Sequence, residues 1–340
     1  MYPTELADSL APFSETGKLN IMYLKRYWGK ALLKRANNLP ADISHNEWQL
    51  DKTLLFTLGV GLEQTMKYIF STAPTFDEFE EWIIKTAGEP DQLKVERFNQ
   101  LLNGEDVSRG AVPDVLTKED LQFFERNGYL IIKNAIPKTD CDDTIEVICK
   151  YIGVERNNPA SWYNYNADRQ GIMVQLFQND LLEKNRQSIK IRQVFEQLYN
   201  RTDLWVTTDR VGFNPPETAN WKFSGPFMHW DVSLQLPIPF RLQGLLYLAD
   251  TAENQGAFTL VPGFQHRIAH WLANLPEGAD PRSQDIDALG STPIAAIAGD
   301  FIVWMQALPH GSRPNTADKP RFVQYITYEP AHNSYVSNWI

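Results

Sequence analysis

Apolar residues recur at helical spacing through the first third of the chain. Two series with steps of three or four residues are Ile21, Leu24, Trp28 and Leu32, and then Leu54, Leu58, Leu62, Met66 and Ile69. Each series predicts one apolar helical face. Thr75 begins a further helix, because Glu78 completes a capping box with it, and Gly88 ends that helix. Residues 18–103 are therefore predicted to be helical.

A polar segment over residues 103–114, which contains glycine and proline, follows the helical part. Such a segment is typical of a domain boundary, which we place near Val112. The prediction is a small all-helical N-terminal domain over residues 1–112 and a second domain over residues 113–340.

The second domain begins with a helix and continues as short apolar runs. Thr117 is predicted to cap a helix that ends at Gly128, and a strand follows over 129–132. Further β-rich runs, separated by proline, glycine and asparagine, cover residues 204–213, 242–248, 258–261, 301–305 and 322–328. Runs of this length and spacing predict an antiparallel barrel or sandwich.

Composition narrows the setting in which this protein works. Acidic side chains number 42 and basic ones 32, a net charge of −10, which argues against nucleic acid as the main partner. The longest nearly uncharged apolar stretch, residues 54–62, is far below the roughly 18 needed to cross a membrane. The first residues lack the pattern of a secretion signal, and Cys141 and Cys149 are the only thiols. We expect a cytoplasmic protein with no membrane partner.

The histidines provide candidate metal ligands: His45, His229, His266, His270, His310 and His332. His229 and Asp231 are two residues apart, so strand alternation would put both side chains on one face. His310 follows an apolar strand and supplies a third ligand. Two histidines and one carboxylate form a facial triad, which suits Fe(II) and leaves coordination positions open. Zinc fits less well, because its catalytic sites usually leave a single position open.

Arg321 is the candidate for binding a carboxylate near this metal. It stands eleven residues after His310, at the head of a predicted strand, and a guanidinium binds a carboxylate through two hydrogen bonds. Ser312 could add a hydroxyl donor. Arg313 is the competing candidate, but we prefer Arg321 because a strand is the more rigid platform.

Several motifs in order resemble the phytanoyl-CoA dioxygenase family of Fe(II)/2-oxoglutarate-dependent oxygenases. The resemblance covers roughly residues 115–330 and rests on the helix, glycine turn and strand of 116–132, His229-Trp-Asp231, the segments 249–256 and 260–263, and the final part from Gly299-Asp300 through His310-Gly-Ser312 and Asn315 to Arg321. It implies a mainly β fold with some α, a double-stranded β-helix (a jelly-roll, cupin-like barrel). The implied iron ligands are His229, Asp231 and His310. Arg321 and Ser312 would hold the distal carboxylate of 2-oxoglutarate, and Tyr247 and Gln175 would contact cosubstrate or substrate.

The resemblance also implies the reaction. Fe(II), 2-oxoglutarate and O2 would hydroxylate an unactivated C–H bond and release succinate and CO2. Desaturation, ring closure and epoxidation use the same ligands and stay open, whereas halogenation is disfavoured because Asp231 occupies the carboxylate position. We expect a free small molecule as substrate, such as an amino acid, a sugar-like compound or a natural-product intermediate. The helical domain is a candidate contact for a homodimer, or an active-site lid.

One segment departs from the family pattern, and two other functions stay open. At residues 262–266 the chain reads Pro-Gly-Phe-Gln-His, where the family typically shows Pro-Gly-Ser-His. The alternatives are a cupin-like iron enzyme without 2-oxoglutarate, and a non-catalytic metal-binding barrel whose helical domain binds a partner. Substitution of Arg321 would separate the first alternative from the oxygenase.

Overall fold

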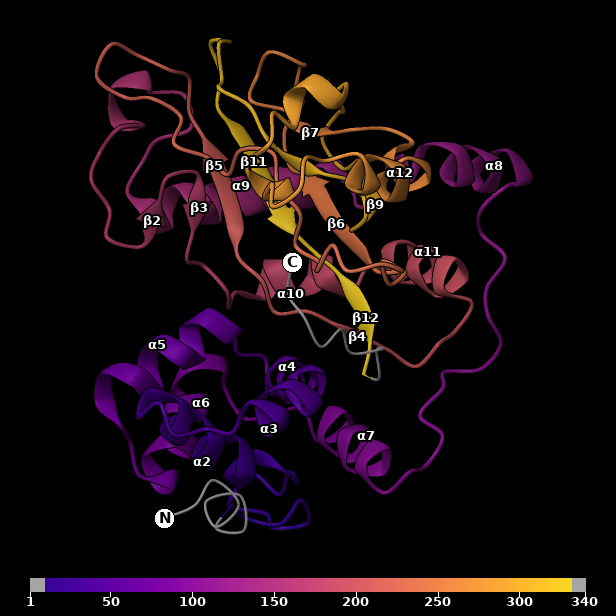
Figure 1. Cartoon of the computed structure of the whole chain (residues 1–340). Helices are drawn as coiled ribbons and strands as arrows, with labels where there is room; N and C mark the ends of the chain where they lie inside the picture. The colour runs from indigo at the N-terminus through magenta and orange to yellow at the C-terminus, as the bar shows by residue number, and fades with distance from the viewer. Residues whose placement is uncertain (1–9, 332–340) are drawn as a thin grey trace. The chain divides into compact units, whose positions relative to one another are not determined.

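Two compact units make up the chain in the computed structural model, which describes residues 10–331 (Figure 1). The first unit contains residues 10–111 together with 201–208 and 329–331, and the second contains 112–200 and 209–328. His332 lies outside the described residues. Within residues 10–331, no helix has the length and apolar character to span a membrane.

The first unit is a helical domain with a small sheet. Its helices are α2 (Leu24–Arg35), α3 (Ala41–Asn46), α4 (Trp48–Thr57), α5 (Leu62–Thr72), α6 (Phe76–Ala87) and α7 (Gln92–Leu102). Strands β4 (Leu204–Val206) and β12 (Tyr328–Pro330) pair with each other. Trp205 and Ala331 join the helices in one buried apolar core. The predicted helical region is confirmed, and it recruits two segments from much later in the sequence.

The caps of this helical unit explain where its helices begin and end. Thr75 Oγ1 accepts a hydrogen bond from the Glu78 backbone N–H at 3.3 Å, as the capping box predicts. The prediction of one helical face over residues 54–69 was wrong, because α4 ends before Gly59. Gly59 adopts a positive φ of 69°, and its N–H donates to the Phe56 carbonyl in a helix-ending turn.

The second unit is a double-stranded β-helix, built from two antiparallel sheets. The larger sheet has the order β1-β9-β6-β11-β5-β3-β2 and the smaller has the order β10-β7-β8. Their strands are β1 (Tyr129–Ile132), β2 (Arg169–Gln170), β3 (Met173–Val174), β5 (Val211–Asn214), β6 (Leu242–Tyr247), β7 (Phe258–Leu260), β8 (Thr292–Pro293), β9 (Phe301–Met305), β10 (His310–Ser312) and β11 (Arg321–Tyr325). An isolated bridge between His229 and His310 extends the smaller sheet.

Helices cover the outer face of the larger sheet. The helices of this unit are α8 (Lys118–Asn127), α9 (Lys138–Ile152), α10 (Asp180–Arg186), α11 (Ile189–Tyr199) and α12 (Ile268–Ala273), with short 3-10 turns η1 (Pro159–Ser161), η2 (Phe264–His266), η3 (Pro281–Ser283) and η4 (Asp287–Leu289). Asn185 of α10 donates to Gln324 of β11 at 2.9 Å, and Phe195 of α11 packs edge-on against Phe301 of β9. The opposite face, with Tyr247 and Trp304, is left to line the barrel interior.

Two predicted strands are each divided in the structure. Residues 204–213 form β4 and β5, which belong to different units, and residues 322–328 form most of β11 and the start of β12. Polar residues interrupt both runs, Thr207 to Arg210 in the first and Thr327 in the second. Helices α10 and α11 were not predicted.

Candidate functional site

Backbone pairing fixes the two candidate histidine ligands next to each other. His229 N–H donates to the His310 carbonyl at 2.8 Å, and His310 N–H donates back to the His229 carbonyl at 2.9 Å. His310 begins β10, which pairs with β7 on its other side. The imidazole rings consequently lie 4.7 Å apart, centroid to centroid.

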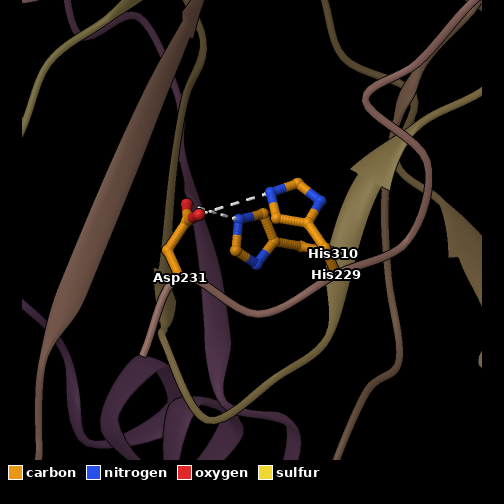
Figure 2. Close-up of side chains that lie close together, drawn as sticks. All are labelled: His229, Asp231 and His310. Atoms are coloured by element: carbon orange, nitrogen blue, oxygen red, sulfur yellow. Dashed lines mark ion pairs between the residues drawn. The ribbon is translucent and has the colours of Figure 1, made fainter. Parts of the chain in front are cut away.

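Asp231 completes a cluster of three candidate ligands (Figure 2). Its Oδ1 lies 3.5 Å from His229 Nε2, and its Oδ2 lies 3.4 Å from His310 Nε2. One ligand atom from each residue lies within 4.8 Å of the others. The prediction that strand alternation puts His229 and Asp231 on one face was wrong. His229 makes an isolated bridge, and Asp231 lies in a bend.

Hydrogen bonds set the tautomer of both histidines. The Nδ1 atom of His229 lies 2.6 Å from the Phe227 carbonyl oxygen, and that of His310 lies 3.2 Å from the Leu308 carbonyl oxygen. Because a carbonyl only accepts, each Nδ1 carries a proton, so the neutral form of each ring has its lone pair on Nε2. Both Nε2 atoms face Asp231: a protonated ring donates to the carboxylate there, and a neutral ring offers the lone pair that a metal ion would bind.

Charge within the cluster shifts two pKa values. Burial works against the charge of Asp231, but hydrogen bonds from His229 and His310 hold the pKa of this carboxyl well below its usual range. Burial also works against a charged His229, yet the hydrogen bond and charge of Asp231 raise its pKa above the ordinary value. The site therefore contains a negatively charged carboxylate that binds cations. A metal ion would replace the proton on Nε2 of His229.

Arg321 is a buried cation that forms no ion pair with any described residue, and the hydroxyl of Tyr247 is a polar group near it. It begins β11 opposite Asn214 of β5, and its side chain is 0% exposed. All three guanidinium nitrogens lack a hydrogen-bond acceptor. An unpaired buried charge costs several kcal/mol, roughly, so this arrangement fits an anionic ligand that enters the barrel. Arg313, the competing candidate, instead donates to Thr259 and Ser291 at 3.1 and 2.6 Å.

The three other residues predicted to contact cosubstrate or substrate have different surroundings in the structure. Ser312 is buried on β10 and lines the same cavity as the histidines. Tyr247 lies near Arg321, but its hydroxyl donates to the Ile294 carbonyl and accepts from Phe258 N–H, at 2.9 and 2.8 Å. Gln175 is not brought to the cluster, and its side chain contacts Gln170 at 3.4 Å.

The candidate ligands open into a cavity of about 290 Å³. Its wall includes the three candidate ligands with Met173, Asp209, Arg210, Pro226, Gln243, Gly244, Phe258, Trp304, Gly311, Ser312, Tyr325 and Thr327. A larger surface hollow of about 1250 Å³, bordered by Trp162 and Lys319, contains none of the ligands. The smaller cavity is therefore the one in which ligand chemistry can occur.

Two residues near the cluster were not predicted from the sequence. Gln243 Nε2 donates to Asp231 Oδ2 at 2.8 Å, and Arg282 donates to the backbone on either side of Asp231. A signal existed for Gln243, because it alternates with Leu245 and Tyr247 on β6 and so shares their inward face. Nothing in the sequence around Arg282 indicates its contacts.

Known proteins share this sequence pattern. Residues 124–323 match the family Phytanoyl-CoA dioxygenase (PhyH). A "Putative phytanoyl-CoA dioxygenase" of Dictyostelium discoideum is 26% identical over 261 residues, 62% of this chain and 74% of that protein. An ectoine dioxygenase of Bordetella bronchiseptica is 20% identical over 275 residues, 74% of this chain and 89% of that protein.

A solved structure supports the fold alone. GlcNAc Inducible Gene 2 of Candida albicans superposes with a TM-score of 0.51 at 15% identity, over 64% of this chain and 65% of that one. The family match spans more than half of the chain and includes the His-Asp-His cluster. The chain therefore belongs to the phytanoyl-CoA dioxygenase (PhyH) family and is an iron- and 2-oxoglutarate-dependent oxygenase.

Proposed function

We propose that this enzyme uses O2 to hydroxylate an unactivated C–H bond of a small organic molecule while it converts 2-oxoglutarate to succinate and CO2. His229, Asp231 and His310 would hold Fe(II). The observation that carries the proposal is Arg321, a fully buried guanidinium in the same barrel as this cluster, which forms no ion pair with any residue in 10–331. An iron enzyme without an anionic cosubstrate would have no use for such a group.

The donor set fits the cofactor that the family implies. Two imidazole nitrogens and one carboxylate suit Fe(II) and leave positions for a chelating acid and O2. When bound, iron and 2-oxoglutarate would activate O2, which oxidises both the C–H bond and the cosubstrate. Asp231 contributes the negative charge, and the backbone carbonyls of Phe227 and Leu308 orient the two imidazoles.

Arg321 and Ser312 would anchor the cosubstrate. A planar guanidinium binds a carboxylate through two parallel hydrogen bonds, which fixes direction as well as position. The Ser312 hydroxyl, which lines the cavity from β10, can add a third. Burial raises the pKa of Tyr247 to about 12 despite the nearby Arg321 charge, so its hydroxyl stays protonated and keeps its contact with Ile294.

The cavity supports a small substrate. A volume of about 290 Å³ has to hold the cosubstrate as well as the reacting part of the substrate. Phe258 and Trp304 make one wall apolar, while Asp209 and Arg210 add charge. A free small molecule fits this space better than the body of a long acyl chain.

Anaerobic titration with Fe(II) and then 2-oxoglutarate tests the proposal. The weak visible charge-transfer band of an iron–2-oxoglutarate chelate is expected with the wild type and should vanish in His310→Ala. Succinate release then reports turnover during substrate screening, and mass spectrometry of the product identifies the added oxygen. Iron-loaded, folded wild type without the band would argue for an iron enzyme that does not use 2-oxoglutarate.

Three broader statements stay predictions. We propose residues 1–112 and 113–340 as the domains, except that segments 201–208 and 329–331 belong to the first unit, together with a homodimer contact on the helical domain and a cytoplasmic location. Light scattering coupled to size-exclusion chromatography would measure the number of copies. A monomer at micromolar concentration would contradict the dimer.

A further inference from the structure

Asp231 lies on a part of the chain that no sheet ladder holds in place. Residues 230–241 contain no strand, and the Asp231 side chain is 46% exposed. His229 and His310, in contrast, fix each other through two backbone hydrogen bonds. A carboxylate ligand has to keep its direction when the metal leaves, or the site must be rebuilt for each binding event. Some other contact must therefore orient this segment.

Arg282 binds the peptide groups on both sides of Asp231. Its Nη1 donates to the Trp230 carbonyl at 2.8 Å, and its Nη2 donates to the Val232 carbonyl at 2.7 Å. The guanidinium is planar and rigid, so two bonds from one fork fix the distance and the relative direction of both carbonyls. Because these carbonyls flank Asp231, they set where its Cα–Cβ bond points.

Local hydrogen bonds fix the backbone at Arg282. The residue is the middle of the short turn η3, where Asp280 Oδ1 accepts from the Arg282 backbone N–H at 2.9 Å. Ser283 Oγ donates to Asp280 Oδ2 at 2.6 Å, and Pro281 is buried. The arginine thus extends from a braced turn, and its positive charge also interacts with the Asp231 carboxylate.

This turn belongs to the long connection between β7 and β8, residues 261–291. The connection contains the segment 262–266 that departs from the family pattern. We propose that Arg282 is a positioning residue, which keeps Asp231 directed at His229 and His310 through the Trp230 and Val232 carbonyls. The inference rests on the proposed function, because it takes those three residues as the metal ligands.

Co(II) binding to the metal-free full chain tests this role. Arg282→Met keeps the length of the side chain and removes both donors, so Co(II) affinity should fall about 10- to 100-fold, and the visible Co(II) spectrum should change. Arg282→Lys should give an intermediate affinity, because an ammonium reaches one carbonyl at a time. The matched control is Arg267→Met in the same connection, where Arg267 donates to the Leu289 carbonyl at 3.3 Å.

Thermal unfolding in EDTA separates folding from metal binding. Wild-type Co(II) affinity and spectrum in a folded Arg282→Met variant would overturn the proposal. If that variant does not fold, Arg282→Lys decides: weakened affinity supports the positioning role, and wild-type affinity overturns it. Failure of the wild type to bind Co(II) or Fe(II) would instead contradict the proposed metal site itself.

Discussion

Single residues set the chemistry of this site, and Arg321 shows how. A guanidinium that is 0% exposed and lacks acceptors is a cost to the ligand-free fold. The same feature makes it a strong receptor for a carboxylate, since no ion pair with a described residue has to be broken first. The residue thus exchanges stability of the empty protein for affinity toward its ligand.

Arg321→Met should remove cosubstrate binding while it spares the metal. Loss of a bidentate, charged contact is expected to weaken 2-oxoglutarate binding by at least about 100-fold. Without cosubstrate, the variant should melt at the wild-type temperature or above, because an unpaired buried charge is gone. Anaerobic calorimetry and thermal unfolding measure both effects. Arg313→Met is the control and should retain affinity; equal losses in the two variants would contradict the assignment.

Acidification should weaken metal binding through His229. Its pKa is raised above 6.5, against the effect of burial, by Asp231, and the protonated ring has no lone pair on Nε2. Metal affinity should therefore begin to fall above pH 6.5 as the pH is lowered. Folding stability of the metal-free protein should change in the opposite direction. The contribution of the charged pair of His229 and Asp231 is present below pH 6.5 and is lost as the pH rises through the raised pKa.

NMR titration of His229 in the metal-free protein checks this shift. Asp231→Asn should lower the pKa of His229, because the compensating charge is removed. A wild-type His229 that titrates below pH 6.5 would show that burial outweighs the carboxylate.

At the residue scale, the sequence predicted what local spacing encodes. His229, Asp231 and His310 follow from spacing and order, and the structure brings them together. The preference for Arg321 over Arg313 came from the predicted strand, whereas the acceptors that distinguish the two guanidinium groups are visible only in the fold. Arg282 was unpredictable, since the two carbonyl oxygens to which its guanidinium donates lie about fifty residues earlier in the chain.

At the level of elements, the approach of β10 to the His229 segment is set by a missing side chain. A Cβ on Gly311 would lie 2.6 Å from the Phe227 carbonyl oxygen and 3.0 Å from the Met228 nitrogen. These are backbone atoms, so the segment itself would have to move. The bridge between His229 and His310 depends on this close approach.

Gly311→Ala should separate the two histidines. We expect a loss of about 1–3 kcal/mol in the free energy of unfolding and a clear fall in Co(II) affinity, measured by urea denaturation and calorimetry. Gly278→Ala is a useful control, because its Cβ would meet nothing within 4 Å, although its φ of 77° costs about 1 kcal/mol. Unchanged metal affinity in Gly311→Ala would refute the steric argument.

Elements with local signals were predictable and those without were missed. The capping box at Thr75 and the N-cap at Thr117 located α6 and α8, and an uninterrupted apolar run located β9. The break at Gly59 was missed because the apolar spacing continues across it. Short strands such as β3 and β8, with two residues each, carry too little periodicity to be recognised.

For the whole molecule, the first unit depends on distant sequence. Trp205 is 5% exposed, packs edge-on against Phe98, and lies under the Arg97 guanidinium at 4.2 Å. A fragment of residues 112–340 would lose this core. We expect it to bind a hydrophobic dye more strongly than the full chain does, and Trp205→Gln in the fragment should reduce that binding. Equal dye binding by fragment and full chain would contradict this expectation.

The discontinuous make-up of the first unit has a consequence for biosynthesis. The chain passes between the units at residues 111–112, 200–201, 208–209 and 328–329. A ribosome that has produced α2 to α7 has still to translate the whole barrel before β12 exists to pair with β4. The helical unit can thus gain its complete core only after residues 329–331 emerge, so the part made first is the part finished last.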